Sequence, residues 1–431
     1  MTTVHSIIAC LLLSASTKVS TGTAILQQRV FQEIHKQGGH VYIGFSYSAN
    51  HSLLPHSCLG IAFDRPTDKA LNSFSLKDIA GLSKLDLSGL TISDQGLKCL
   101  DNLPHLLEVN LIDTSMTDAG METIACLKEL NALRITSESV SDAGLATIEP
   151  ISGLNLLNLH NCRKVTGECL IKIPRSVRKL GLGSTGISDE TISHLKDRVN
   201  LRSLDISSTD VTDNGIRELG STLKLTDLDV SMTGISDQGF RIIGTWKTLE
   251  SLRATYNPEI SDVSYKYIAR LSRLRRLDLS GTHLGDEVGD GFGSLKDLEE
   301  LSLYGTKISD IGLAGLHLPL KLRTLDVSGT NVRGRGLTVL NNCVCIRKLG
   351  LYGLEIEDKD LKILKSLSYL ESLDLHSTDV SDGSLDILVS LGRLREVDLR
   401  DTKISKKGLR YLKKMRPDLR INVIEMWRFV A

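Results

Sequence analysis

The sequence predicts an α/β solenoid, in which short repeated units stack and each unit contributes one strand and one short helix. Three observations support this prediction. A 24-residue phrase recurs along most of the 431-residue chain, its first part alternates apolar and polar residues, and its second part spaces apolar residues by three. Because one such unit cannot bury its own apolar side chains, we expect a horseshoe with a parallel concave sheet and short convex helices.

The recurring phrase is LxxLxLxxTx[IV][ST]DxGLxxL, and it begins about fourteen times between residues 82 and 418. Val177 and Ile346 open the fifth and twelfth units, and leucine opens the others. These first leucines are Leu82, Leu106, Leu130, Leu154, Leu201, Leu225, Leu249, Leu274, Leu298, Leu322, Leu370 and Leu394.

The first half of each unit predicts a strand with one buried face. In the sixth unit Leu204 and Ile206 alternate with Ser203, Asp205 and Ser207. An alternation with a period of two places the apolar side chains on one side of a strand. The strands of neighbouring units should therefore pair in parallel and share one apolar layer.

The second half, DxGLxxLxxL, predicts a short helix or helical turn. A serine or threonine followed by aspartate precedes it, and these side chains accept hydrogen bonds from the free amides of a first helical turn. We interpret the aspartates as helix caps rather than as an acidic binding face. The pairs are Ser93-Asp94, Thr117-Asp118, Ser141-Asp142, Thr212-Asp213, Ser236-Asp237, Ser309-Asp310 and Ser381-Asp382.

Threonine recurs at the ninth position of the unit. A buried hydroxyl both donates and accepts, so we expect a ladder that bridges the backbones of neighbouring units. Cys162 and Asn257 take this position in the fourth and eighth units, which carry one extra residue after it. The threonines are Thr114, Thr185, Thr209, Thr233, Thr282, Thr306, Thr330, Thr378 and Thr402.

Composition limits the function classes. Apolar residues make up 41% and aromatic residues 4% of the chain, which indicates an aliphatic core. Lysine plus arginine equals aspartate plus glutamate at 52 each, so no net charge holds nucleic acid or an anionic membrane, and charge-based recognition must be local. The eight cysteines form no CxxC pair, and we expect them to be reduced.

The units resemble the leucine-rich repeats of large bacterial families abundant in planctomycetes, with their SGTxISDxGLxxLxxL phrase. Residues 34–42, IHKQGGHVY, resemble the short phrase that often precedes those arrays. The fourth unit, with Cys162, is similar to the cysteine-containing repeats of F-box adaptors of ubiquitin ligases. The resemblance implies a recognition fold, but residues 1–80 contain no F-box, and Leu53-Leu54-Pro55 alone is not one.

Both ends of the array need caps. We expect residues 25–81 to form a non-repeat N-terminal cap, with a strand over residues 40–47 and irregular structure over residues 48–81. We expect a C-terminal cap over residues 419–431. It begins with a strand, and it covers the last apolar layer with Met426, Trp427 and Phe429.

Residues 1–24 contain a short apolar run, IIACLLLSA over residues 7–15, which is too short to span a bilayer. It fits either a weak export signal, with a cleavage site near residues 22–24, or a loose terminus. The location is open, and we favour the cytoplasm over export.

The sequence contains no P-loop, no GxGxxG after a strand, no GxSxG and no HExxH, so we expect no enzyme and no cofactor. One group has metal-ligand composition: His35, His40, His51, His56 and Cys58. Their spacings match no zinc pattern, and we favour polar cap residues over a metal site.

The concave face is where repeat arrays usually bind partners. Its fifth-position column is acidic, is interrupted by Arg134 and Arg253, and reads either as a solvated face or as a binding stripe. The column comprises Asp86, Asp205, Asp229, Asp278, Asp326, Asp374 and Asp398.

Tyrosine and arginine dominate interface energetics, and several lie near the seventh and eighth positions of the later units. We predict that a partner-binding patch forms there, against the alternative that the tyrosines lie flat on neighbouring strands. Its residues are Arg253, Tyr256, Tyr304, Tyr352, His376 and Arg400.

Two functions remain open at this stage. The first is a monomeric protein-protein interaction module that binds a protein or peptide on its concave face, with no nucleic acid and no membrane span. The second is a substrate-recognition adaptor of a ubiquitin-ligase complex, or a host-directed effector, whose residues 1–80 bind a second protein complex. An exposed apolar groove in that region would favour the second.

Overall fold

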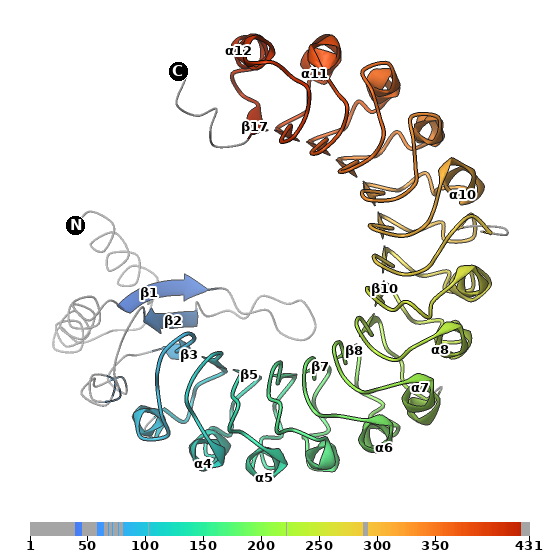
Figure 1. The fold of residues 1–431 in the computed structure, drawn as a ribbon. Coiled ribbons are helices and arrows are strands. Elements are labelled where there is room, and N and C mark those ends of the chain that lie inside the picture. The colour runs from blue at the N-terminus through green and yellow to red at the C-terminus, as the bar shows by residue number, and fades with distance from the viewer. Residues whose placement is uncertain are drawn as a thin grey trace. The chain divides into compact units, whose positions relative to one another are not determined.

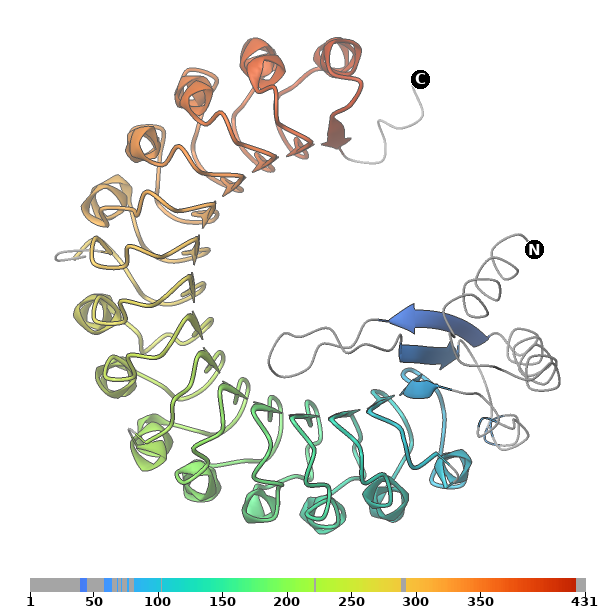
Figure 2. The same cartoon turned by 180° about the vertical axis from the view of Figure 1, so that it is seen from behind.

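The computed structural model describes residues 39–44, 58–63, 68, 71, 76, 81–101, 103–220, 222–287 and 292–423. The chain forms two compact units, residues 1–201 and residues 202–431. Within each unit the strands line one side and the helices the other, as Figures 1 and 2 show from opposite directions.

The first unit contains a sheet that starts with an antiparallel pair and continues in parallel. Strand β1 pairs antiparallel with β2, β2 pairs in parallel with β3, and parallel pairing continues to β7. The strands are β1 (Gly39–Gly44), β2 (Cys58–Phe63), β3 (Leu82–Asp86), β4 (Glu108–Leu111), β5 (Ala132–Ile135), β6 (Leu156–Asn158) and β7 (Lys179–Gly181).

The N-terminal strands differ in part from the expectation. The strand predicted over residues 40–47 is present over Gly39–Gly44. Residues 58–63, expected to be irregular, form β2 instead. An unpaired strand edge leaves backbone groups without partners, and β2 satisfies those of β3. The predicted cover of Met426, Trp427 and Phe429 lies outside the described residues.

The second unit contains ten described strands, and all of them are parallel. The central residue of each strand pairs with the central residue of the next, as Leu228 does with Leu252. The strands are β8 (Ser203–Asp205), β9 (Asp227–Asp229), β10 (Ser251–Arg253), β11 (Arg276–Asp278), β12 (Glu300–Ser302), β13 (Thr324–Asp326), β14 (Lys348–Gly350), β15 (Ser372–Asp374), β16 (Glu396–Asp398) and β17 (Arg420–Asn422).

The helices are short and mix α and 3-10 geometry, as the spacing of apolar residues predicts. In the first unit they are η2 (Gly96–Leu100), α4 (Asp118–Ala125), α5 (Asp142–Ala146), η3 (Glu168–Ile171), α6 (Asp189–Ile192) and η4 (Ser193–Leu195). In the second they are α7 (Asp213–Leu219), α8 (Asp237–Ile243), η5 (Asp262–Ser264), α9 (Tyr265–Ile268), α10 (Asp310–Gly315), η6 (Gly336–Asn342), η7 (Asp360–Ser366), η8 (Asp382–Ser384), α11 (Leu385–Ser390) and α12 (Lys406–Met415).

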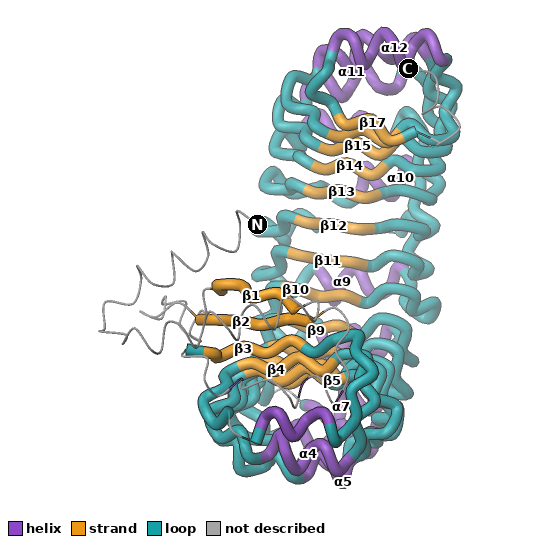
Figure 3. Tube along the Cα trace, turned by 90° about the vertical axis from the view of Figure 1, so that its left-hand side faces the viewer, coloured by secondary structure: helices purple, strands orange, loops and turns teal. Residues whose placement is uncertain are grey.

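The core lies between the strands and the helices of each unit. In the repeat that begins at Leu225, the side chains of Leu225, Leu228 and Val230 are buried, whereas Asp227 and Asp229 between them are half-buried. The alternation therefore works as predicted. Figure 3 shows the resulting row of strands with helices beside it. The prediction of parallel strands with short helices is confirmed.

The aspartates at the helix starts have a different partner from the one predicted. In α4 the cap is Thr117, whose hydroxyl accepts from the Ala119 N–H. Asp118 instead accepts from the N–H (2.7 Å) and the hydroxyl (2.6 Å) of Ser141 in the next repeat. The cap interpretation is therefore wrong for the aspartates, because stacking places the next helix start beside each carboxylate.

We call these residues the outer aspartates. The same two-point contact recurs in both units. Its pairs are Asp68 with Ser93, Asp94 with Thr117, Asp142 with Thr166, Asp213 with Ser236, Asp237 with Ser261, Asp286 with Ser309, Asp358 with Ser381, and Asp382 with Ser405.

The threonine ladder is also assigned differently. The hydroxyl of Thr306 donates to the Leu303 carbonyl of its own repeat, at 2.8 Å, and the eight other threonines do the same three residues back. The predicted ladder between repeats is therefore wrong for eight of these threonines, whose hydroxyls close their own turns, whereas the Thr233 hydroxyl also reaches the Asn257 Oδ1 of the next repeat at 3.3 Å. The Nδ2 of Asn257 does bridge, donating to the Val230 carbonyl at 2.8 Å.

Candidate functional site

Three rings on the strand side of the second unit form a continuous row, which we call the ring row: Tyr304, Tyr352 and His376. The ring centroids of Tyr304 and Tyr352 are 6.4 Å apart with 12° between the planes. Those of Tyr352 and His376 are 4.8 Å apart, at 33°. All three side chains are half-buried. Ring pairs at such distances attract each other, so the row is an ordered surface that solvent still reaches.

The repeat explains why the rings line up. Tyr304, Tyr352 and His376 each stand two residues after a strand, namely β12, β14 and β15. Parallel strands are about 4.8 Å apart, so side chains at one position of the repeat form a line along the sheet. The repeat between the two tyrosines carries Ser328, which is buried and whose hydroxyl accepts the Tyr352 N–H at 3.0 Å. Its small side chain leaves room for the rings to approach.

A strip of exposed backbone lies beside the ring row. The eighth position has a left-handed conformation, and glycine occupies it at Gly305, Gly329 and Gly353, with φ of 64°, 62° and 69°. All three are exposed. Glycine adopts this conformation without strain and adds no side chain. A partner can therefore reach the backbone next to the rings.

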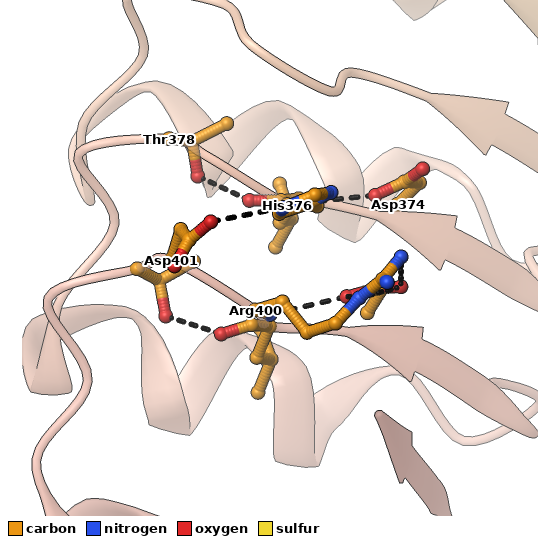
Figure 4. Close-up of polar contacts among 9 residues, drawn as sticks. Asp374, His376, Thr378, Arg400 and Asp401 are labelled. Carbon is orange, nitrogen blue, oxygen red and sulfur yellow. Dashed lines mark hydrogen bonds and ion pairs between the residues drawn. The ribbon is translucent and has the colours of Figure 1, made fainter. Parts of the chain in front are cut away.

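The far end of the ring row is acidic, as Figure 4 shows. The Nε2 of His376 lies 3.1 Å from the Oδ2 of Asp401, and its backbone N–H donates to Asp374 at 2.9 Å. Burial raises the pKa of Asp374, and the negative charge of Asp398 adds to this, although the His376 N–H acts in the opposite direction. The Nε of Arg400 donates to both carboxylate oxygens of Asp398 at 3.0 Å.

The acidic fifth-position column has a local structural role that sequence reasoning missed. In each case the carboxylate accepts the backbone N–H two residues further on, as Asp205 accepts from Ser207 at 2.9 Å. We call these residues the inner aspartates. A solvated face alone is therefore an incomplete interpretation, because each carboxylate shapes the turn after its strand. The seven are Asp86, Asp205, Asp229, Asp278, Asp326, Asp374 and Asp398.

The two arginines that interrupt the column neutralise carboxylates of the preceding repeat. Arg253 lies 2.8 Å from the Oδ2 of Asp229. Arg134 forms an ion pair with Glu108, which also pairs with Lys84. Burial alone would raise the pKa of Glu108, but the hydrogen bonds from both cations outweigh it and leave the pKa lowered.

Tyr256, which was predicted to belong to the same patch, lies apart from the ring row. It occupies the eighth position with a φ of 54°, and its side chain is 53% exposed. The ring covers Gly281, where an added Cβ would lie 2.6 Å from the Tyr256 Cδ1. The sequence did not distinguish this position from the seventh, which holds Tyr304.

A shallow depression lies on the strand side of the second unit, and its lining includes Arg253 but no residue of the ring row. Its volume is about 230 Å³, and strands β10 to β13 line it. Arg253, Arg276, Asp278 and Glu300 are among the lining residues. Charged groups of both signs meet here, which suits a polar partner surface more than a small apolar ligand.

Most of the five residues considered as possible metal ligands lie outside the residues whose side chains the structure describes. His35, His51 and His56 lie outside the described residues, and His40 and Cys58 are described only as backbone positions on β1 and β2. Among the residues described with side chains, no three histidine, cysteine or acidic residues lie together as metal ligands would. The free thiols in this part are Cys99, Cys126, Cys162, Cys169, Cys343 and Cys345.

Within the described ranges, no helix is both long enough and apolar enough to cross a bilayer.

Comparison with known proteins identifies the fold. A family model described as Leucine Rich repeat matches residues 199–220. A leucine-rich-repeat protein of Leptospira interrogans is 19% identical, with a TM-score of 0.52 over 84% of this chain and 88% of that one. An internalin of Listeria monocytogenes is 17% identical, with a TM-score of 0.42 over 92% and 94%. No curated protein sequence matches. The fold is that of a leucine-rich-repeat solenoid.

Proposed function

We propose that this leucine-rich-repeat protein binds a partner protein or peptide on the strand side of its second unit, and that the ring row is the central contact. The observation that carries the proposal is the arrangement of Tyr304, Tyr352 and His376 as a stacked row that remains half-exposed. Aromatic side chains are the residues on which binding energy most often concentrates.

The row is already ordered before a partner arrives. Tyr304 and Tyr352 stack on each other, and Asp401 holds the ring of His376. Fixing a mobile side chain at an interface costs about 0.5–1.5 kcal/mol, and a stacked ring has little of that freedom left to lose. A partner that contacts these rings therefore loses less binding free energy to the ordering of side chains.

The surroundings supply polar partners for such a contact. The exposed glycine strip offers backbone next to the rings, and Asp401 at the acidic end offers carboxylate oxygens. We place Tyr256, Arg253 and Arg400 at the rim of the same surface. Tyr256 is the most exposed of the three aromatic candidates, whereas both arginines are already paired with aspartates.

The test is a double truncation, Tyr304→Ala with Tyr352→Ala. Each interfacial ring typically contributes about 2 kcal/mol or more, so we expect recovery of the partners captured by the natural protein from native lysate to fall at least about tenfold. The measurement is quantitative mass spectrometry of proteins captured by the two forms in parallel.

A matched control is Tyr369→Ala. This tyrosine is 40% exposed, and its ring carries the Arg393 guanidinium at 4.5 Å instead of belonging to the ring row. Recovery should be unchanged in the control. A folded double variant that captures the same proteins in the same amounts would remove the ring row as the contact.

The expected repeat subtype and the alternative adaptor function remain predictions. The resemblance to planctomycete repeats and to F-box adaptors concerns subtype, and the adaptor function depends on residues 1–80. The structure describes only residues 39–44, 58–63, 68, 71 and 76 of that region. We retain the interaction module as the proposed function, acting as a monomer without a catalytic role, and assign no location.

A further inference from the structure

Helix α12 carries a concentrated positive charge on its solvent-facing side. Its ten residues, KKGLRYLKKM, contain five cations and no carboxylate. The whole chain is neutral, so this charge is local. We call these residues the basic face: Lys406, Lys407, Arg410, Lys413 and Lys414.

The five cations lie on one side of the helix. At 3.6 residues per turn they fall within an arc of about 120°. Gly408 and Leu412, on the opposite side, are buried in the unit. All five cationic side chains are exposed. The basic face therefore points away from the core, next to α11, at the end of the second unit that Figure 3 shows.

The neighbouring carboxylates are already engaged. Asp382 accepts from Ser405, Asp386 accepts from the Tyr411 hydroxyl at 3.0 Å, and Asp418 pairs with Arg416. Within the described residues Lys407, Arg410, Lys413 and Lys414 form no ion pair. The described unit therefore leaves these four cations of the basic face without a carboxylate.

Lys406 and Lys407, in the first turn of α12, do not stabilise the helix, whereas Lys413 and Lys414 in its last turn suit the helix dipole. Helices α4, α5, α7, α8 and α10 begin with an aspartate, whereas α12 begins with Lys406. Cations in a first turn oppose the helix dipole, and like charges three or four residues apart repel. An external anion would offset both effects.

We propose that the basic face docks the protein on an anionic phospholipid surface. Four of the five cations are lysines, which act as point charges toward a diffuse anionic layer, whereas specific phosphate recognition in nucleic acids favours arginine forks. Tyr411, which is 38% exposed, borders the basic face, and Met415, which is 47% exposed, ends the helix after Lys414. Such amphipathic and apolar side chains suit a headgroup layer, and the Met415 thioether has no hydrogen-bond donor to offer a phosphate.

The contact is peripheral rather than inserted. An inserted helix buries its apolar side in the bilayer, and in α12 that side, with Leu412, packs in the unit. Binding should then depend on charge, weaken with salt, and change about fivefold for each lysine removed.

The experiment is flotation of the full chain with vesicles of phosphatidylserine and phosphatidylcholine in equal parts, and with phosphatidylcholine alone. We expect binding to the anionic vesicles only, and release at high salt. The variant Lys413→Gln with Lys414→Gln should lose about twentyfold in partitioning. The matched control, Lys362→Gln with Lys365→Gln, removes equal charge from η7 and should change partitioning less than twofold.

Folding is checked by thermal unfolding, and the α12 variant should be about as stable as the natural protein, because it loses both like-charge repulsion and the favourable interaction of its last-turn lysines with the helix dipole. The proposal is overturned if the natural protein binds neither kind of vesicle, or if the two variants bind alike. Retention on immobilised polyglutamate without vesicle binding would also overturn it and would assign the basic face to an acidic protein.

Discussion

The outer and the inner aspartates use the same chemistry for different purposes. Both accept backbone N–H groups, but Asp118 accepts from Ser141 in the next repeat, whereas Asp205 accepts from Ser207 two residues away. The outer contact holds neighbouring repeats together. The inner contact only shapes the turn that follows its own strand. The same residue type can therefore stabilise either the contact between two repeats or the turn within one repeat.

The difference explains where side chains vary. Along the helix starts, an outer carboxylate and the serine or threonine it binds constrain each other, so substitution affects two repeats. After the strands, the inner carboxylate bonds within its own repeat, and the seventh position holds side chains as different as Ser328, Tyr352 and His376. The candidate binding surface therefore lies at positions where contacts between repeats constrain the choice of side chain least.

The outer contact also explains the glycine of the DxGL phrase. An added Cβ at Gly144 would overlap the Asp118 carboxylate and come within 3.0 Å of the Asp118 Cα. An added Cβ would overlap the corresponding aspartate of the preceding repeat in the same way at Gly120, Gly239, Gly312, Gly336 and Gly408. Glycine here provides space for a carboxylate, in a helical conformation that other residues adopt readily.

The largest expected effect comes from breaking the outer contact. Asp118→Ala removes two charge-assisted hydrogen bonds to Ser141 and should lower the free energy of unfolding by about 3 kcal/mol. Gly144→Ala, which in an ordinary helix stabilises by about 1 kcal/mol, should destabilise here by about 2 kcal/mol. Guanidinium unfolding of the full chain measures both changes.

The two changes should not add. Once the Asp118 carboxylate is removed, the Cβ that Gly144→Ala introduces has room, so the double variant should be more stable than the sum of the single changes predicts. The control is Gly153→Ala, whose nearest neighbour is a carbonyl oxygen at 3.7 Å, and which should stay within about 0.5 kcal/mol. Strict additivity would contradict the assigned contact.

Much of the fold could be predicted from the sequence, because period and alternation alone define a stacked parallel sheet. The partner of Asp118 could not. Its own helix start and that of the next repeat both present free amides, and only stacking determines which lies closer. β2 was missed for a related reason: residues 58–63 repeat nothing, and their strand depends on the open edge of β3.

A medium effect tests the threonine assignment. Thr306→Val removes one buried hydrogen bond, from the hydroxyl to the Leu303 carbonyl, and should cost about 1 kcal/mol in unfolding free energy. Thr282→Val in the preceding repeat should cost about the same. Because each bond closes its own turn, the double variant should equal the sum of the two. A coupling energy above about 0.5 kcal/mol would instead indicate a ladder between repeats.

The candidate site was predictable only in part. Equal positions in the repeat placed Tyr304, Tyr352 and His376 in one column, and the structure brings these rings together. Tyr256 was grouped with them because it occupies the eighth position of its repeat, next to the seventh position that they occupy. Its left-handed φ of 54° directs the ring over Gly281 instead. Backbone conformation at a single residue decides this, and the repeat pattern does not encode it.

The smallest effect compares one carboxylate from each class by titration. Burial alone would raise the pKa of Asp142, but N–H groups of Cys169 and Thr166 outweigh it and leave the pKa lowered. Burial raises the pKa of Asp374, and the charge of Asp398 adds to it. Carboxyl NMR titration should therefore find Asp142 below and Asp374 above the usual aspartate range.

The two shifts have opposite consequences for stability. The contribution of Asp142 is present above the ordinary aspartate pKa and is lost as pH falls through its lowered value. Ionised Asp374 destabilises the protein, and this cost disappears as pH falls through its raised value. Asp374→Asn keeps an acceptor for the His376 N–H and should stabilise at neutral pH by at most about 0.5 kcal/mol, because solvent screens a half-buried carboxylate. Loss of stability in this variant would mean that the inner carboxylate charge contributes to folding, as the outer one does.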